Sequence, residues 1–226
     1  MMFRKPALQV ALDLTDLNKA IELATLLTTN LPKDYLIIEA GTPLIKSWGV
    51  LAPRLLKNIT GATIFADTKT MDTGALEARL MIDNGADIVS VLSVSSEDTI
   101  KEFIGETHTY GKLAAVDLIN NPAPVETAIK TLDLGADIII YHVGIDVQIK
   151  RGITVADLID EIKYLIRIIR NRKSNAFVAV AGGLKPGLVS SFIEAGVDIV
   201  IVGSAIIKSS NPLSISRELL SEMGVI

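Results

Sequence analysis

The sequence contains no cysteine, which excludes disulfide bonds, cysteine-ligated zinc and a cysteine nucleophile. Its net charge is only −4, so no strongly basic surface is available for nucleic acid or an anionic membrane. The apolar runs are short and interrupted by aspartate or glycine, so we expect no transmembrane helix. A strand-like run begins at Ala7 with no signal peptide before it. Together these absences favour a cytoplasmic protein.

A repeated phrase organises the chain. Residues 84–89 (NGADIV) recur as residues 134–139 (LGADII) and 195–200 (AGVDIV). In each copy the glycine follows a helix-like run and can end it by adopting a positive φ. The apolar run after each aspartate is continuous, which is typical of parallel strands covered on both faces. Such strands alternating with helical patterns predict a parallel sheet of βαβ units.

Eight strand–helix units in 226 residues predict an α/β fold, a (β/α)8 TIM barrel forming one domain over residues 1–226. The alternative is an open doubly wound sheet, but no Gly-x-Gly-x-x-Gly follows the first strand to support it. The predicted strands end near Asp13, Ala40, Asp67, Leu92, Leu118, His142, Ala181 and Gly203. Helix starts are predicted at Thr42-Pro43, Asn121-Pro122, Asn211-Pro212 and the Thr154–Asp157 capping box.

Acidic residues collect where these strands end. Asp13, Glu39 and Asp67 lie at or beside strand ends, and Asp117 lies one residue before its own. Lys69 is two residues beyond Asp67, so in an extended chain both side chains point the same way. Burying several carboxylates beside one lysine is costly unless they pair, bind a cation or act on a substrate. Barrel enzymes place their sites at this end, so we expect chemistry here.

Each acid also has a simpler interpretation. Any one of them could cap a helix, and Asp72 in particular stands where the N-cap of the next helix belongs. Asp13 could simply begin a loop. A group of Glu39, Asp67 and Lys69 on neighbouring strands is harder to explain in this way.

The C-terminal part of the chain carries a different signal. Gly182 and Gly183 follow the seventh predicted strand, and Gly203 and Ser204 follow the eighth. Glycines there allow backbone N–H groups to approach an anion, and these two loops are the usual phosphate site of the barrel. His142 ends the sixth strand, where an imidazole that titrates near neutrality suits a proton shuttle.

Several phrases resemble a known family. The segment Asp67-x-Lys69-x-x-Asp72 resembles the signature of the orotidine monophosphate decarboxylase superfamily. Longer phrases are similar to one branch of it, the hexulose-6-phosphate synthases, and the resemblance spans nearly the whole chain. These phrases are residues 8–13 (LQVALD), 39–46 (EAGTPLIK), 67–74 (DTKTMDTG), 142–148 (HVGIDVQ), 179–183 (AVAGG) and 201–203 (IVG).

The resemblance implies a magnesium-dependent aldolase that reversibly condenses formaldehyde with ribulose 5-phosphate to give hexulose 6-phosphate. It also implies a homodimer in which Asp72 reaches the neighbouring site. Orotidine monophosphate decarboxylases carry a lysine at the second-strand position and need no metal. Glu39 at that position favours the metal-dependent branch.

The residues fit this chemistry. An enediolate forms when a C1 proton is removed, and Mg²⁺ held by Glu39 and Asp67 would stabilise its charge. Lys69 would add a second positive group, and His142 is the candidate base. Asp13 would bind substrate hydroxyls or orient Lys69, and Asp117 would hold a hydroxyl or a water molecule.

Two other functions remain open. Decarboxylation of 3-keto-L-gulonate 6-phosphate uses the same enediolate, but that branch typically has an arginine just after the sixth-strand histidine, where this chain has Val143 and Gly144. A non-catalytic phosphosugar-binding protein is the third possibility, although clustered acids serve a mere binder poorly. One departure from the superfamily is Ser204, where relatives often carry an arginine; phosphate binding would then depend more on backbone amides and the serine hydroxyl.

Overall fold

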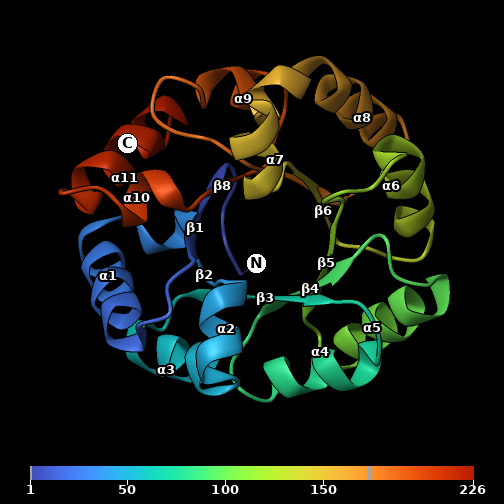
Figure 1. The fold of residues 1–226 in the computed structure, drawn as a ribbon, viewed down its shortest axis with the longest axis horizontal. Helices are drawn as coiled ribbons and strands as arrows, with labels where there is room; N and C mark the ends of the chain where they lie inside the picture. Colours follow the sequence, from blue (N-terminus) through green and yellow to red (C-terminus); the bar gives the residue numbers. More distant parts are fainter. Residues whose placement is uncertain (1, 173–174) are drawn as a thin grey trace.

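Eight parallel strands form a closed barrel in the computed structural model, which describes residues 2–172 and 175–226. Each strand is hydrogen-bonded to the next in the chain, and β8 closes the ring against β1 (Figure 1). The predicted TIM barrel is therefore confirmed. The strands are β1 (Ala7–Leu12), β2 (Leu36–Ala40), β3 (Thr63–Thr70), β4 (Ile88–Leu92), β5 (Leu113–Asp117), β6 (Ile138–His142), β7 (Phe177–Ala181) and β8 (Ile199–Val202).

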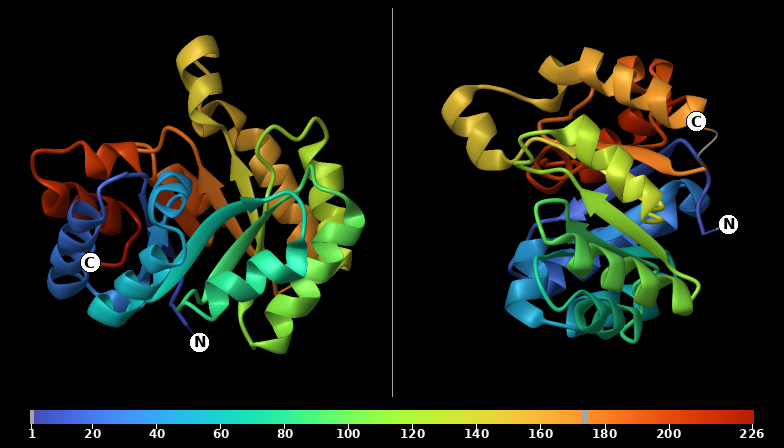
Figure 2. Two further views of the ribbon diagram at one scale, coloured as in Figure 1. Left: turned by 60° about the horizontal axis from the view of Figure 1, so that its bottom comes forward. Right: turned by 90° about the vertical axis from the view of Figure 1, so that its right-hand side faces the viewer.

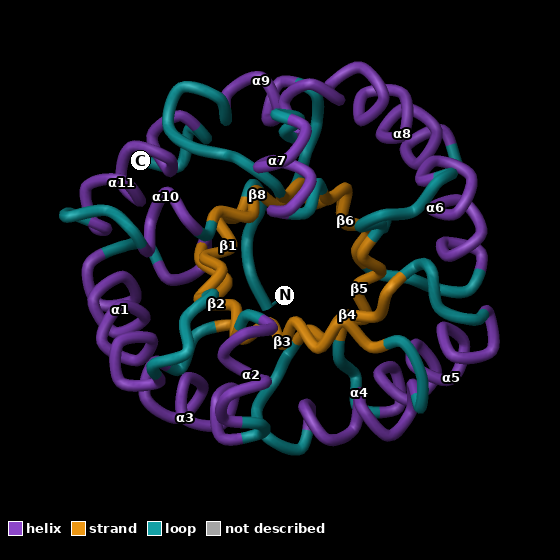
Figure 3. The backbone as a smooth tube through the Cα atoms, in the orientation of Figure 1, coloured by secondary structure: helices purple, strands orange, loops and turns teal. Residues whose placement is uncertain are grey.

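Helices surround the strands as an outer ring (Figure 3). Within the described residues, no helix combines the length and apolar character needed to traverse a bilayer. The α-helices are α1 (Leu17–Asn30), α2 (Thr42–Trp48), α3 (Leu51–Thr60), α4 (Gly74–Ile82), α5 (Glu97–Thr109), α6 (Pro124–Asp133), α7 (Ile145–Arg151), α8 (Ile159–Asn171), α9 (Ser190–Glu194), α10 (Ser204–Ile207) and α11 (Pro212–Glu222). The described residues also form 3₁₀ helices at Lys33–Tyr35 and Val155–Leu158.

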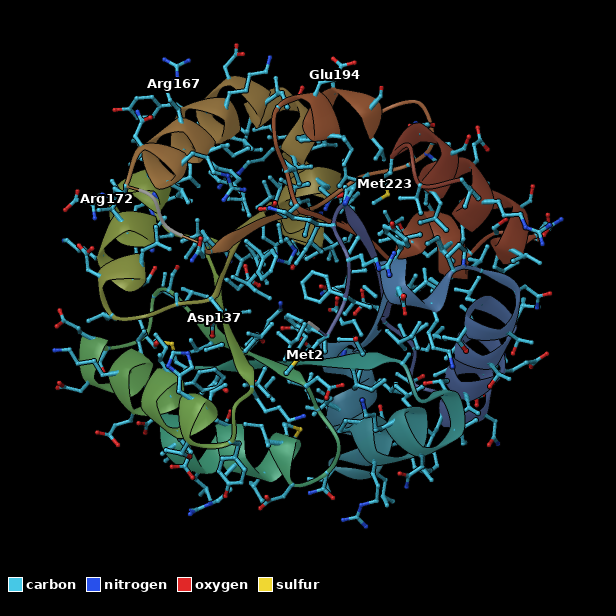
Figure 4. All side chains as sticks on the ribbon, turned by 180° about the vertical axis from the view of Figure 1, so that it is seen from behind. Met2, Asp137, Arg167, Arg172, Glu194 and Met223 are labelled. Atoms are coloured by element: carbon cyan, nitrogen blue, oxygen red, sulfur yellow. The ribbon has the colours of Figure 1, made fainter. Side chains whose placement is uncertain are left out.

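The apolar side chains form two separate layers. The larger layer lies between the strands and the helices, and the smaller one fills the inside of the barrel. Phe3 belongs to the inner layer and packs against Phe177, with their ring centroids 5.0 Å apart. Seen from behind, Met2 lies over the centre of the barrel (Figure 4). The N-terminal segment therefore covers this end of the barrel, and the opposite end is left to receive a substrate.

Most predicted strand ends agree with the structure to within one residue. The exception is β3, which continues to Thr70 rather than ending at Asp67. The pairing between β3 and β4 shifts between Ala66 and Thr70, and Lys69 has a left-handed φ of 48°. The strand therefore bulges through the Asp67–Lys69 segment, and an extended backbone does not explain how these side chains meet.

The predicted helix starts have mixed outcomes. Asn211 caps α11 through a bond from the Ser214 amide, and the Thr154–Asp157 capping box is present. Gly41 rather than Thr42 precedes α2 as its cap, because the Thr42 hydroxyl instead donates to Asp67.

Two further helix starts are placed differently. Helix α6 begins at Pro124 and not at Pro122, since the Asn121 side chain accepts the Ala123 amide in a turn that delays the helix. Thr73 precedes α4 as its cap, so the interpretation of Asp72 as the N-cap is wrong.

The aspartates of the repeated phrase tie neighbouring strands together at the N-terminal end of the barrel. Each one accepts the backbone N–H of a residue in the preceding strand, and each also pairs with basic side chains. Asp87 accepts from Ile64 and pairs with Lys57 and Lys112, Asp137 accepts from Ala114 and contacts His108, and Asp198 accepts from Val178 and pairs with Lys5 and Arg170. The repeat is therefore a structural device that recurs on every second strand from β4.

Replacing Asp87 with asparagine is expected to destabilise the fold by about 3 kcal/mol, because it leaves two lysines and a buried amide without their carboxylate. Burial raises the pKa of Asp87, but Lys112, Lys57 and the Ile64 amide outweigh it and lower that pKa. The stabilisation is therefore complete above the pKa of an unfolded aspartate, about 3.9, and is lost as pH falls through the lower folded value.

Urea unfolding of the Asp87→Asn variant across pH checks this expectation. The matched control is Asp34→Asn, which removes an exposed carboxylate paired with exposed Arg4 and should cost less than about 1 kcal/mol. Equal destabilisation by the two substitutions, or an Asp87 effect that persists unchanged in acid, would contradict the structural role.

Candidate active site

The side-chain alternation of the strands carries polar groups to the open end of the barrel. Successive residues point to opposite faces, so residues two apart both face inward. In five strands an apolar residue of the inner layer comes two positions before a candidate site residue. These pairs are Ala11 and Asp13, Ile37 and Glu39, Phe65 and Asp67, Ala115 and Asp117, and Ile140 and His142. The polar side chains therefore lie directly above the inner apolar layer of the barrel.

A cavity of about 420 Å³ opens over this layer, which is large enough for a phosphorylated pentose. Helix α7 stands beside it, projecting from the barrel on the side away from the N-terminus (Figure 2). The cavity brings together most of the predicted site residues. Those that line it are Asp13, Glu39, Asp67, Lys69, His142, Gly182, Gly183, Gly203 and Ser204.

Asp67 and Lys69 form the centre of a hydrogen-bond network. Lys69 Nζ lies 2.9 Å from Asp67 Oδ2 and 3.2 Å from Asp117 Oδ2. The Ser90 hydroxyl donates to Asp67 Oδ1 over 2.9 Å, and the Thr42 hydroxyl donates to Oδ2 over 2.8 Å. Burial lowers the pKa of Lys69, but Asp67 and Asp117 outweigh it and raise that pKa. Lys69 is therefore a fixed positive charge at the cavity wall.

Glu39 is almost fully buried, and Gln9 holds it in place. The residue is 5% exposed, and Gln9 Nε2 donates to Glu39 Oε2 over 2.6 Å. Burial, followed by repulsion from Asp67 and Asp13, raises the pKa of Glu39 well above its ordinary value. An ionised Glu39 therefore increases the affinity of this position for a cation.

Asp13 also lines the cavity, close to the Glu39 and Asp67 carboxylates. A Cβ atom added to Gly41 would lie 2.3 Å from Asp13 Oδ1, so only glycine fits beside this carboxylate. Asp13 is accessible through the cavity but enclosed by protein around it. This enclosure and the nearby Asp67 carboxylate raise its pKa, although Lys69 and His142 act in the opposite direction.

Asp117 and His142 form a dyad. The His142 Nδ1 atom lies 3.0 Å from Asp117 Oδ2, and Asp117 Oδ1 also accepts the Ile119 amide over 2.9 Å. Burial raises the pKa of Asp117, but His142 and Lys69 outweigh it and bring that pKa to about 2. The ionised carboxylate can only accept, so Nδ1 carries the proton and Nε2 is left as the basic nitrogen.

Two predicted site residues lie outside the cavity lining. Asp117 is 2% exposed and is occupied by Lys69 and His142, so it is placed to position those groups rather than to touch substrate. Asp72 is exposed in the loop before α4, where it accepts the Thr73 amide over 2.8 Å. It does not join the cavity of its own chain.

Glycine turns after β7 form another part of the cavity lining. Gly182 and Gly183 have φ angles of 117° and 82°, which L side chains rarely adopt. A Cβ atom at Gly182 would lie 2.4 Å from the Val143 carbonyl oxygen, and one at Gly183 would lie 2.8 Å from Thr154 Cγ2. Both positions therefore require glycine, and their backbone is left open to the cavity.

The candidate list from the sequence missed three polar residues of this network, namely Gln9, Thr42 and Ser90. Gln9 and Ser90 could have been found, because each is a lone polar residue inside an otherwise apolar strand-like run. Such residues are expected to satisfy a buried partner. Thr42 gave no such signal, since its role as a helix cap accounted for it.

Proteins of known family have sequences similar to this chain. Residues 6–219 match the family described as orotidine 5'-phosphate decarboxylase / HUMPS. The chain is 37% identical to 3-hexulose-6-phosphate synthase 1 of Staphylococcus saprophyticus, over 93% of this chain and 95% of that protein. It is also 37% identical to the bifunctional enzyme Fae/Hps of Methanoculleus marisnigri, over 96% of this chain but 53% of that protein. The chain thus spans about half the length of this bifunctional relative.

Solved structures show the same architecture. The crystal structure of a 3-hexulose-6-phosphate synthase superposes with a TM-score of 0.86 and 32% identity, covering 96% of this chain and 99% of that one. A structure of KGPDC from Streptococcus mutans superposes with a TM-score of 0.85 and 25% identity, covering 98% of this chain and 97% of that one. On the family match and these relatives, the chain belongs to the orotidine 5'-phosphate decarboxylase / HUMPS family.

Proposed function

We propose that this chain catalyses the reversible aldol condensation of formaldehyde with D-ribulose 5-phosphate to give hexulose 6-phosphate. The observation that carries the proposal is one cavity lined by His142, whose ring is held by Asp117 behind it, by a fixed lysine, by two buried carboxylates and by glycine turns. The synthases among its relatives support the same reaction.

The first step is removal of a proton from C1 of the ketose. Nε2 of His142 accepts this proton, while the Asp117 carboxylate fixes the ring and stabilises the imidazolium that forms. The electron pair of the broken C–H bond moves toward the C2 carbonyl oxygen, which gives an enediolate. Lys69, held at the cavity wall by Asp67 and Asp117, places a positive charge near the developing anion.

The second step forms the carbon–carbon bond. C1 of the enediolate attacks the carbon of formaldehyde, and the C2 carbonyl is restored. The former formaldehyde oxygen takes a proton, which the imidazolium of His142 supplies. The base is thereby regenerated, and the atoms of both reactants are all retained in the product.

Magnesium fits the donors of this cavity. No group of three or more His, Cys, Asp or Glu side chains is arranged to hold a metal within residues 2–172 and 175–226. Mg²⁺, however, needs only one or two carboxylates when substrate oxygens and water complete its shell. Glu39 and Asp67 are the candidate ligands, because burial and the neighbouring Asp67 and Asp13 carboxylates raise the pKa of Glu39, and a bound cation would offset both effects. When bound, the ion would offset negative charge that develops on the substrate oxygens.

The phosphate of the substrate is assigned to the wall formed by Gly182, Gly183, Gly203 and Ser204. Their backbone N–H groups and the serine hydroxyl are suitable donors for phosphate oxygens. Asp13, which adjoins Gly203, is left to bind a sugar hydroxyl.

The decarboxylase alternative is less well supported by this chain. Val143 occupies the position after the sixth-strand histidine, and its side chain is buried rather than directed into the cavity. Gly144 follows it, so neither position supplies a cation for a substrate carboxylate. The same enediolate chemistry would still operate, which makes the substrate the deciding measurement.

The homodimer stays part of the proposal, with Asp72 of one copy serving the site of the other. Its support is the exposure of Asp72 and of Met71 beside it, 53% exposed, on the loop after β3. A monomer in light scattering at assay concentrations, together with full activity, would contradict this arrangement.

The test is consumption of formaldehyde with ribulose 5-phosphate, measured with Mg²⁺ and with a chelator. In parallel, carbon dioxide release from 3-keto-L-gulonate 6-phosphate is measured. We expect rapid, magnesium-dependent formaldehyde consumption and a much slower decarboxylation. Faster decarboxylation would favour the alternative enzyme, and binding of both sugars with turnover of neither would indicate a non-catalytic protein.

A further inference from the structure

The four residues assigned to the substrate phosphate include no cationic side chain. A sugar phosphate carries a charge of about −1.5 to −2 at neutral pH. Gly182, Gly183, Gly203 and Ser204 offer backbone amides and one hydroxyl, while the Asp13 carboxylate adjoins Gly203, where an added Cβ atom would lie 3.2 Å from Asp13 Oδ2. An anion of this charge needs a cation nearby to offset that repulsion.

Lys208 also lines the cavity, and its position follows from the short helix α10. Its backbone N–H bonds to the Ser204 carbonyl oxygen over 3.1 Å, so the two residues are four apart on one helical turn. Residues at this spacing lie on the same face, and side chains lean toward the start of the helix. Lys208 therefore follows Ser204 by one helical turn on the wall of the same cavity, so its ammonium group can turn toward Ser204 and Gly203.

The two lysines of the cavity differ in their partners. Lys69 is held by Asp67 and Asp117, which commits its charge to the reacting end. Lys208 forms no ion pair with any side chain in the described parts of the chain, and it is exposed to solvent. It is thus a free cation at the anion-binding end of the same cavity.

We propose that Lys208 is the phosphate-binding cation of this site and determines its preference for phosphorylated substrates. The assignment rests on the proposed function for the identity of the sugar, but not for the recognition of phosphate itself. Ser204 and Lys208 then act together, the hydroxyl as a short donor and the ammonium group as a long one from the same helical face.

The test compares Lys208→Gln, Lys208→Arg and Lys185→Gln. Lys185 lies in the loop after β7, is exposed and is absent from the cavity lining, so it is the matched loss of a nearby charge. Calorimetry measures the affinity of each protein for inorganic phosphate and for ribulose 5-phosphate. We expect Lys208→Gln to weaken both affinities about tenfold, Lys208→Arg to keep them within about threefold, and Lys185→Gln to match the parent.

Kinetics add a second readout. Lys208→Gln should raise KM for ribulose 5-phosphate about tenfold while kcat stays within about twofold, because the lysine contacts the phosphate in ground and transition states alike. If the parent binds phosphate through Lys208 but does not condense formaldehyde, the reaction is wrong and the lysine assignment stands. Equal affinities of the parent and Lys208→Gln, equal losses in Lys208→Gln and Lys185→Gln, or no phosphate binding by the parent would overturn the assignment.

Discussion

Replacing Glu39 with glutamine is expected to lower the rate of formaldehyde condensation by about 1,000-fold or more while the protein stays folded. The loss follows from the proposed role of Glu39 as a magnesium ligand, since an ion that offsets developing negative charge contributes several kcal/mol of transition-state stabilisation. Glutamine keeps the volume of Glu39 and offers a carbonyl oxygen to the Gln9 side-chain amide, which donates to Glu39 Oε2 in the parent. The substitution therefore removes the charge without leaving a cavity.

The same substitution should leave the metal-free protein as stable as the parent or more stable. The folded-state pKa of Glu39 is raised, so its contribution to stability is largest below the unfolded pKa and is lost as pH rises through the folded one. At neutral pH the buried Glu39 side chain is thus a cost to folding that glutamine removes. A buried acidic side chain that costs folding free energy is expected where it has a functional role.

Thermal unfolding with and without Mg²⁺ separates these effects. Magnesium should raise the midpoint of the parent and have little effect on Glu39→Gln, since a ligand stabilises only the state that binds it. The exposed Glu22 on α1 supplies the control substitution Glu22→Gln, which should behave as the parent. Full activity of Glu39→Gln in the presence of a chelator would refute the metal assignment.

Replacing His142 with alanine is expected to abolish exchange of the C1 proton of ribulose 5-phosphate with solvent deuterium. A positioned general base contributes about 10²–10⁴-fold, and the structure offers Nε2 of His142 as that base. Asp117→Asn should slow exchange less severely, because the imidazole remains but loses the carboxylate that fixes its tautomer. NMR of the substrate in deuterium oxide follows both variants directly.

The chain provides its own control for this experiment. It has only two histidines, and the other one, His108, contacts Asp137 at the far end of the barrel. His108→Ala should therefore exchange the C1 proton at the parental rate once folded. Unchanged exchange in His142→Ala would remove this residue as the base and direct attention to the carboxylates around it.

The barrel fold can be predicted from the sequence because the patterns that indicate it are local. Continuous Ile and Val runs, glycines that end helices and aspartates before the next strand recur with the spacing of one strand–helix unit. The inward alternation also places Glu39 and Asp67 at one end, since each follows an inward apolar residue by two positions. Such patterns need no knowledge of distant contacts.

Other parts of the site depend on contacts that the sequence does not encode locally. The bulge of β3 gives Lys69 its left-handed φ, and it arises from the shifted pairing with β4. The sequence suggests Asp117 as a ligand of substrate or water, but its burial between Lys69 and His142 is visible only when three strands are assembled. The aspartates of the repeated phrase likewise indicate only strand starts in the sequence, because their hydrogen bonds to the preceding strands form between residues far apart in the chain.

The position of those aspartates has a consequence for how this protein can change over evolutionary time. Asp87, Asp137 and Asp198 tie the strands together at one end of the barrel. The proposed active site lies at the other end, and the inner apolar layer separates the two. Effects of substitutions at distant, unshared positions add independently. Residues at the catalytic rim can therefore be randomised to seek new substrates while thermostability is adjusted separately at the opposite rim, which makes the chain a suitable starting point for directed evolution.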